Sequence, residues 1–236
     1  MEQSLLHFQA YVPAPEIVPF RDSFVYRYTE KSIEQAIIQK LARIVSALCA
    51  SKQLFSTGLF QELGAIQRIL DELNEDTAFL CLAVVDGTTS DLHTKYLDDF
   101  YLEEFDAENL SAPSPKRSML PRKKIRAYLA NHETTSVPNS RAVLLFEKIS
   151  KTYSGFVHAA SPHVMDMFDG SKFLVRGMRG THRERECADD LWNYFYRSML
   201  TFALTAKAFG DVDHFECIRD FAKNFEQISG EIRSNE

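Results

Sequence analysis

The residues best suited to chemistry gather in a basic stretch from Lys172 to Arg185. The segment KFLVRGMRGTHRER carries five Lys or Arg side chains and one acidic side chain, in a chain whose formal net charge is −6. Its two glycines allow backbone N–H groups to turn toward an anion, and a helix beginning near Glu184 would add its positive end. Arginine binds phosphate through paired hydrogen bonds. We predict a phosphate- or RNA-binding surface formed by Lys172, Arg179, Arg183 and Arg185, next to Arg176 and His182.

The same cations have a structural alternative. The expected third helix, residues 92–105, is acidic, and the basic stretch would anchor it through surface ion pairs. A second basic run, from Lys116 to Arg126, would extend an anion-binding surface if the first interpretation holds.

A second candidate group lies in KTYSGFVHAASPH, residues 151–163. Ser154 and His158 share one helical face, where a histidine can act as a general acid or base. Gly155 in mid-helix indicates close approach of another backbone or a ligand. A solvated surface histidine is the alternative. A metal pair formed by His158 and His163 is disfavoured because the proline between them disturbs the geometry, so we expect neither a metal nor another cofactor.

A third group, Arg68, Glu72 and Glu75, lies on the helix that we expect to be central. Arg68 and Glu72 are four residues apart, as in a solvated ion pair. The alternative is a semi-buried polar cluster, because this helix becomes apolar on every side from Ala78 onward. We treat Arg68, Glu72 and Ser154 as candidate members of such a cluster.

The central helix itself is expected from Leu59 to Val85. Its apolar residues recur at alternating steps of four and three, which places them on one helical face: Leu59, Leu63, Ile66, Leu70, Leu73, Thr77, Leu80 and Val84. Gly58 predicts a short connection, and hence an antiparallel pair, with a preceding helix. The same periodicity predicts the other helices, at about residues 24–55, 92–105, 122–132, 139–160, 184–209 and 211–228. Only residues 172–175 resemble a strand.

Prolines 13, 15 and 19 set the first 22 residues apart. Because proline disrupts a regular helix, we predict an extended Pro-rich N-terminal arm that covers the domain's own core or reaches a second protein. Residues 23–230 form one helical domain, in which residues 106–139 are a loop-rich basic insertion. The fold class is therefore all-α, a multi-helix bundle.

Composition excludes several classes of protein. Apolar residues make up 45% and charged residues 25%, as in an ordinary globular domain. The net negative charge disfavours a general nucleic-acid coat or an anionic membrane surface as partner. The four cysteines lie far apart; we expect free thiols, with Cys49 and Cys81 buried, and a reducing compartment. Without a signal peptide or a spanning segment, a cytoplasmic location is expected.

Two features together resemble a known family. Arg68-x-x-x-Glu72 on a central helix and YSGFVHAAS, residues 153–161, are similar to a bacterial family of helical domains of unknown function, related to abortive-infection proteins and close to the HEPN superfamily. The resemblance implies a HEPN-like bundle that forms homodimers. Many HEPN domains are metal-independent ribonucleases whose motif is an Arg, four to six residues, then a His. Arg176 and His182 fit this spacing, and His158 competes for the role.

The resemblance implies RNA cleavage by transesterification at the 2′-hydroxyl, with one histidine as acid or base, arginines holding the phosphate and no metal. We therefore expect a ribonuclease domain of a toxin or phage-defence system. The alternative is a non-catalytic helical binding module of such a system, which contacts partners through the N-terminal arm and the basic stretch. A metal-dependent helical-bundle enzyme ranks last.

Overall fold

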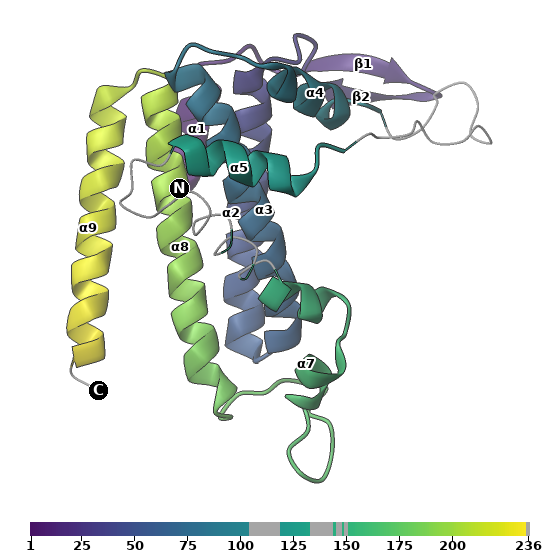
Figure 1. The fold of residues 1–236 in the computed structure, drawn as a ribbon, viewed down its shortest axis with the longest axis vertical. Helices are drawn as coiled ribbons and strands as arrows, with labels where there is room; N and C mark the ends of the chain where they lie inside the picture. Colours follow the sequence, from purple (N-terminus) through teal and green to yellow (C-terminus); the bar gives the residue numbers. More distant parts are fainter. Residues whose placement is uncertain (104–118, 133–143, 145–147, 149–150, 235–236) are drawn as a thin grey trace.

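Four long helices form the body of the protein (Figure 1). The structure is a computed structural model that describes residues 1–103, 119–132, 144, 148 and 151–234. Helices α2 (Ile33–Thr57), α3 (Phe60–Val85) and α8 (Arg183–Ala208) pack against one another, and α9 (Val212–Ser234) packs against α8. The prediction of a mostly helical bundle is confirmed for this part of the chain. The predicted bounds of α3 and α8 agree with the observed ones to within one residue, whereas α9 continues to Ser234, beyond the expected end near residue 228.

The α2–α3 pair is the antiparallel hairpin that the glycine predicts. Gly58 ends α2 in the left-handed region, with φ of 77°. At the other end Ser32 and Gln35 form a capping box, in which each side chain accepts a hydrogen bond from the other's backbone N–H. Each helix of the pair buries most of its apolar stripe. The most buried members are Ile37, Leu41, Ile44 and Leu48 of α2 and Leu63, Leu70 and Leu80 of α3.

The prediction of an extended arm over residues 1–22 is wrong for residues 2–9. Glu2–Gln9 form helix α1, because the first proline comes only at position 13, and Phe8 is completely buried against Phe202 and Phe209. A β-hairpin follows, with β1 (Glu16–Phe20) antiparallel to β2 (Ser23–Arg27). A two-stranded sheet tolerates Pro19 because each strand has a free edge.

The hairpin also corrects the first long helix. The periodicity predicted a start near Phe24, but that residue lies in β2, paired with Pro19, and α2 begins at Ile33. The aromatic and β-branched residues of Ser23–Arg27 suit an exposed strand as well as the start of a helix, so their types alone do not decide between the two. The strand expected at residues 172–175 is reduced to an isolated bridge between Phe168 and Phe173.

Two shorter helices cover one end of the bundle. α4 (Asp91–Phe100) ends before the predicted position, and α5 has the bounds predicted, Arg122–His132. α5 lies across α3 and buries Ile125, Leu129 and Ala130 (Figure 1). Of the predicted insertion, residues 106–118 and 133–139 lie outside the described residues. The described part, α5, is an integral layer of the bundle.

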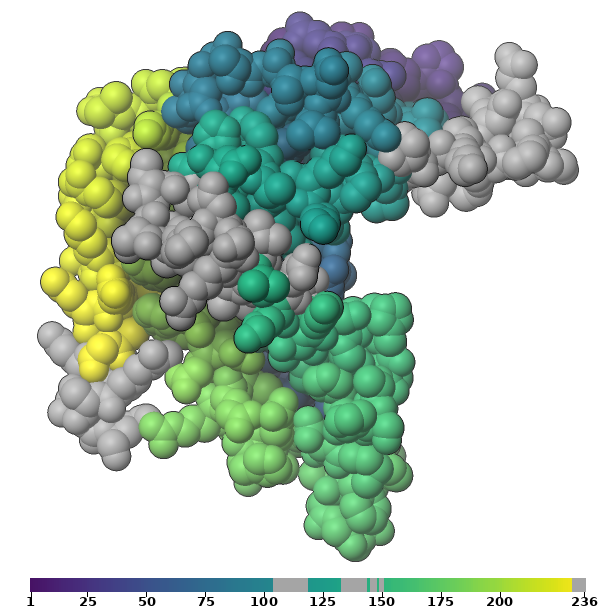
Figure 2. All heavy atoms as spheres, in the orientation of Figure 1, coloured from purple at the N-terminus to yellow at the C-terminus, as the bar shows by residue number. Residues whose placement is uncertain are grey.

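The opposite end carries the basic stretch. Helical residues 151–157, the short α7 (Ser161–Met165) and the loop after it precede α8. This loop extends beyond the end of α8 and projects as a lobe in the space-filling view (Figures 1 and 2). In the described parts of the chain, no helix has the length and apolar character needed to cross a membrane.

All four cysteines are free thiols, as expected. Cys81 and Cys187 are buried, whereas Cys49 and Cys217 are exposed. The expectation that Cys49 is buried is therefore wrong. It follows the buried Leu48 on α2, and its own side chain is exposed.

Candidate functional site

The second half of α3 buries an unusual number of polar side chains. Asp71, Glu75 and Asp76 are each no more than 6% exposed, and Asn74 lies among them. Buried carboxylates are costly unless they are paired and hydrogen-bonded. Their partners therefore show which elements build this site.

Helix α5 supplies two of the partners. Arg126 donates through Nε to Glu75, at 3.0 Å from Oε1, and is itself buried. Arg122 lies between two carboxylates: it donates to Glu75 Oε2 at 2.5 Å and to Asp76 at close contact. The neighbouring carboxylates outweigh the effect of burial and raise the pKa of Arg122. This pairing attaches α5 to the centre of the bundle.

Asp76 completes its coordination with groups from two further helices. Lys40 of α2 donates to Oδ2 at 2.9 Å, and Tyr96 of α4 donates to the same atom at 2.8 Å. Burial raises the pKa of Tyr96 well above its ordinary value, and Asp76 adds to the effect. Asp76 therefore joins four helices, α2, α3, α4 and α5, through these two side chains and that of Arg122.

Helix α8 supplies the partner of Asp71. Arg197 donates through Nη1 to Asp71 Oδ1 at 2.7 Å, and its side chain remains 32% exposed. Burial raises the pKa of Asp71, although Arg197 opposes the shift. One turn along, Thr201 donates to Asn74 Oδ1 at 2.7 Å. Further polar contacts, from Asn74 to Ser198 and from Cys81 to Thr205, also join α3 and α8. Of these contacts, the one with Asp71 leaves a guanidinium partly accessible.

A cavity of about 340 Å³ lies where α3, α5 and α8 meet. Its polar wall is the network just described, its remaining wall is aliphatic, and a histidine from the end of α5 closes one side. A volume near 300 Å³ is the lower end of what small-ligand sites enclose. The lining residues are Asn74, Glu75, Ala78, Leu82, Leu129, His132, Arg197, Leu200, Thr201 and Leu204.

His132 is held by its neighbours on the rim of this cavity. Its Nδ1 lies 3.2 Å from Asp86 Oδ2, at the end of α3, and its ring packs against Tyr128 with centroids 4.4 Å apart. The side chain is 32% exposed. An imidazole oriented by a carboxylate and open to solvent is the arrangement that general acid–base chemistry uses.

Sequence reasoning missed this site, although a signal was present. Arg126 and His132 are separated by five residues inside one helix, which is the Arg-to-His spacing that the HEPN resemblance implies. The charge anomaly at residues 172–185 drew attention to Arg176 and His182 instead. The helix at residues 122–132 falls within the predicted loop-rich insertion, so His132 was not among the predicted site residues.

The predicted basic stretch is exposed, and part of it is paired locally. Arg179 lies 2.8 Å from Glu184, and Arg183 lies 2.5 Å from Glu186 and 3.5 Å from Asp166. The acidic helix α4 lies at the other end of the bundle (Figure 1), so the alternative in which this stretch anchors it is wrong. Lys172, Arg176, His182 and Arg185 are exposed and make no ion pair with another described residue.

The loop that carries these residues is fixed to the α2–α3 turn. Met178 N–H donates to Gly58 O at 2.8 Å. Gly177 has φ of 136°, and a Cβ there would lie 2.4 Å from Thr57 O, so only glycine fits. This stretch and the cavity form two separate sites: Arg183 and Arg197 are fourteen residues apart on α8, about 21 Å along its axis.

The other candidate residues lie on α3 and in the helical segment and turn of residues 151–160. His158 is exposed and Ser154 half-buried, at the end of helical residues 151–157. A Cβ on Gly155 would lie 2.0 Å from the ring of His163, so the close approach is that of a side chain, where we expected a backbone or a ligand. Arg68 and Glu72 form a 2.7 Å ion pair that is partly solvated. Glu75 belongs to the buried network described above.

Metal binding at the cavity is disfavoured by its own chemistry. Arginine or lysine occupies each buried carboxylate, and the one group of described residues with metal-ligand spacing lies elsewhere. No family model, curated protein or solved structure matches the chain. Function therefore has to be inferred from the chemistry of the site.

Proposed function

We propose that the protein is a HEPN-like, metal-independent ribonuclease domain whose reaction centre is the cavity between α3, α5 and α8. The observation that carries the proposal is that this cavity is lined by both an accessible arginine, Arg197, and a solvent-accessible histidine, His132. These are the two functional groups that RNA cleavage without metal requires: a cation for the phosphate and an acid or base for the proton.

Arg197 is suited to hold a phosphate. One nitrogen of its guanidinium is occupied by Asp71, which fixes the side chain, while about a third of the side chain remains exposed. A guanidinium has five N–H donors, so donors remain for a phosphodiester oxygen. Asp71 acts as a positioning residue, because it contacts Arg197 and is itself almost fully buried.

His132 supplies the proton transfer. As base it takes the proton of the ribose 2′-hydroxyl, whose oxygen then forms a bond to phosphorus. The bond to the 5′-oxygen breaks, and that oxygen takes a proton from solvent or from the second histidine of a dimer. Arg126 has the motif spacing to His132 but is buried against Glu75, so its role is to hold α5 in place.

The basic stretch would then guide the RNA backbone toward the cavity. It comprises the loop before α8 and the first turn of α8, at the end of that helix away from the cavity, and its exposed cations without an ion pair to a described residue are Lys172, Arg176 and Arg185. The resemblance further implies a homodimer and, separately, a role in a toxin or phage-defence system of the cytoplasm. Analytical ultracentrifugation tests the dimer.

Cleavage of mixed RNA in EDTA tests the proposal. We expect the wild type to cleave and His132→Ala to lose cleavage while its melting temperature stays within a few degrees of the wild type. The matched controls, His158→Ala and His182→Ala, remove exposed histidines outside the cavity and are expected to retain cleavage. Loss in His182→Ala with retention in His132→Ala would move the reaction to the basic stretch. No cleavage by wild type would contradict the nuclease.

A second candidate function is a non-catalytic RNA-binding module. The observation that favours it is the exposed basic stretch, which needs no histidine to bind a polyanion. Binding of single-stranded RNA should then weaken with salt, and Arg176→Ala and Arg185→Ala should each reduce affinity without changing stability. Retained binding together with absent cleavage would select this function.

A further inference from the structure

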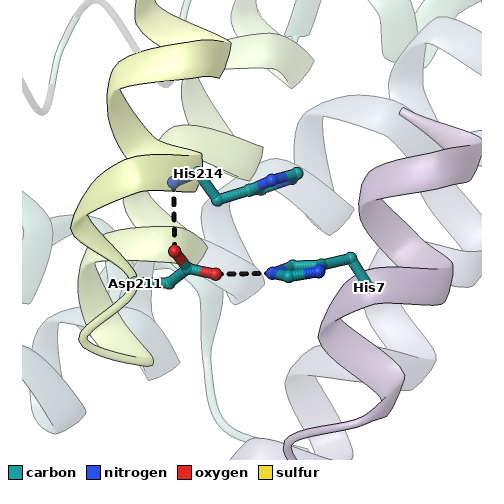
Figure 3. A group of neighbouring side chains, drawn as sticks. All are labelled: His7, Asp211 and His214. Carbon is teal, nitrogen blue, oxygen red and sulfur yellow. Dashed lines mark hydrogen bonds and ion pairs between the residues drawn. The ribbon is translucent and has the colours of Figure 1, made fainter.

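Three metal-ligating side chains converge where the first helix meets the last. His7 comes from α1, whereas Asp211 and His214 lie at the start of α9, about 200 residues away in sequence (Figure 3). The Nε2 atom of His7 lies 2.5 Å from Asp211 Oδ2. One ligand atom from each of the three residues lies within 4.8 Å of the other two.

The carboxylate of Asp211 is oriented by hydrogen bonds to both of its oxygens. Its Oδ1 accepts the His214 backbone N–H at 3.0 Å, which caps the start of α9. Its Oδ2 accepts Tyr11 OH at 2.7 Å and faces His7. Burial opposes the charged form, but the hydrogen bonds from His7, Tyr11 and the His214 amide outweigh it and lower the pKa of Asp211 to about 2.

His214 has a ring that no side-chain hydrogen bond holds within the described chain. Its Nε2 atom is buried without a partner, and its ring stacks on that of His7 with centroids 4.4 Å apart. Burial and the neighbouring His7 lower the pKa of His214. Neutral imidazole is the form that binds metal. His214 therefore has a ring nitrogen without a hydrogen bond and offers a ligand atom within 4.8 Å of those of His7 and Asp211.

We propose that His7, Asp211 and His214 form a zinc site that fastens α1 to the start of α9. Two imidazoles and one carboxylate are a ligand set that Zn²⁺ uses, with water in the fourth position. The side chain of His7 is 45% exposed, which leaves that position open to solvent.

The required movements are small. Bonds of about 2.1 Å in a tetrahedron separate two ligand atoms by about 3.4 Å. His7 Nε2 and Asp211 Oδ2, now 2.5 Å apart, therefore move apart by about 0.9 Å, and the ring of His214, which no side-chain hydrogen bond holds, turns toward them. Zinc takes the place of the proton between His7 and Asp211, with His7 keeping a proton on Nδ1. The cap on α9 is undisturbed, since it uses the other oxygen of Asp211.

The experiment is a zinc titration of the full chain after it has been stripped with a chelator. Calorimetry should show one Zn²⁺ per chain, and Zn²⁺ should raise the melting temperature. His7→Gln and His214→Gln should each weaken zinc binding by about tenfold or more. Loss of a residue that only hydrogen-bonds to a metal ligand already costs about tenfold in metal affinity, and loss of the ligand itself should cost at least as much. The matched control, His158→Gln, removes an exposed histidine elsewhere and should leave binding unchanged.

Two further measurements keep the proposal falsifiable. Cobalt substitution should give a tetrahedral absorption spectrum that His214→Gln abolishes. Cys217 is exposed one turn after His214, so Cys217→Ser checks that its thiol is not the ligand. The proposal is overturned if both His7→Gln and His214→Gln still bind zinc as the wild type does. It is also overturned if the wild type binds no stoichiometric zinc while its melting curve shows that it is folded.

Discussion

Replacing Arg126 by methionine tests the buried network that attaches α5 to the bundle. Arg126 is 5% exposed, and its counter-charge is Glu75, which is equally buried. Methionine keeps the length of the side chain and removes the charge. Glu75 then retains only Arg122, which it shares with Asp76.

The structure sets the size of the effect. Breaking a buried ion pair by removing one partner costs about 3–5 kcal/mol, because the other charge stays buried and is left under-compensated. For a chain of this length, that loss lowers the melting temperature by about 6–20 °C. The matched control is Arg219→Met, whose partners Glu216 and Asp220 are exposed, as is Arg219 itself. A surface pair contributes about 0–1 kcal/mol, so this variant should stay near the wild type.

A double-mutant cycle separates the charge from the packing. Glu75→Leu alone leaves Arg126 buried without its counter-charge. The double change Glu75→Leu with Arg126→Met removes both charges, and Arg122 keeps its ion pair with Asp76. The double variant should be more stable than the sum of the two single changes predicts, by about 1–3 kcal/mol. Urea denaturation of the four proteins measures this difference. If Arg126→Met costs no more than Arg219→Met, or if the two changes simply add, the inference that this pair holds α5 in place is refuted.

Three other outcomes follow from burial. Phe8→Ala should lower the free energy of unfolding by about 3–5 kcal/mol, because the ring is fully buried in the core; thermal denaturation measures it. Burial raises the pKa of the Cys81 thiol to about 12, so a thiol reagent should label Cys49 and Cys217 in the native protein and Cys81 only after unfolding. Burial lowers the pKa of His93, so unfolding takes up a proton there as pH falls below about 6.5, and stability is lost; His93→Leu should flatten that part of the stability curve.

Helical periodicity was sufficient to predict the long elements. The stripe from Leu59 to Val84 identified α3, and Gly58 correctly predicted its antiparallel pairing with α2. Such patterns depend on residues within one or two turns of each other, so they are readable without the tertiary structure. The β-hairpin was missed because Phe24 and its neighbours suit a short exposed strand as well as a helix start, and only the pairing with residues 16–20 decides between them.

The candidate site was harder to predict because its contacts join distant parts of the chain. The sequence predicted either a solvated ion pair or a semi-buried polar cluster for Arg68, Glu72 and Glu75. Arg68 and Glu72 form a partly solvated ion pair, whereas Glu75 is buried. Its partners Arg122 and Arg126 lie about 50 residues away, and no local pattern links them. The position of His132 was correctly assigned to a helix, but its proximity to Arg197 depends on how α5 crosses α3.

The two proposals also rest on different kinds of contact. At the cavity, every buried carboxylate of α3 contacts a cation, and Arg197 and His132 are the groups that we propose to act on a substrate. At the ends of the chain, Asp211 faces a histidine and a tyrosine, and His214 has an unoccupied ring nitrogen. Chelation therefore separates the two functions: EDTA should weaken the attachment of α1 while leaving the proposed cleavage chemistry intact.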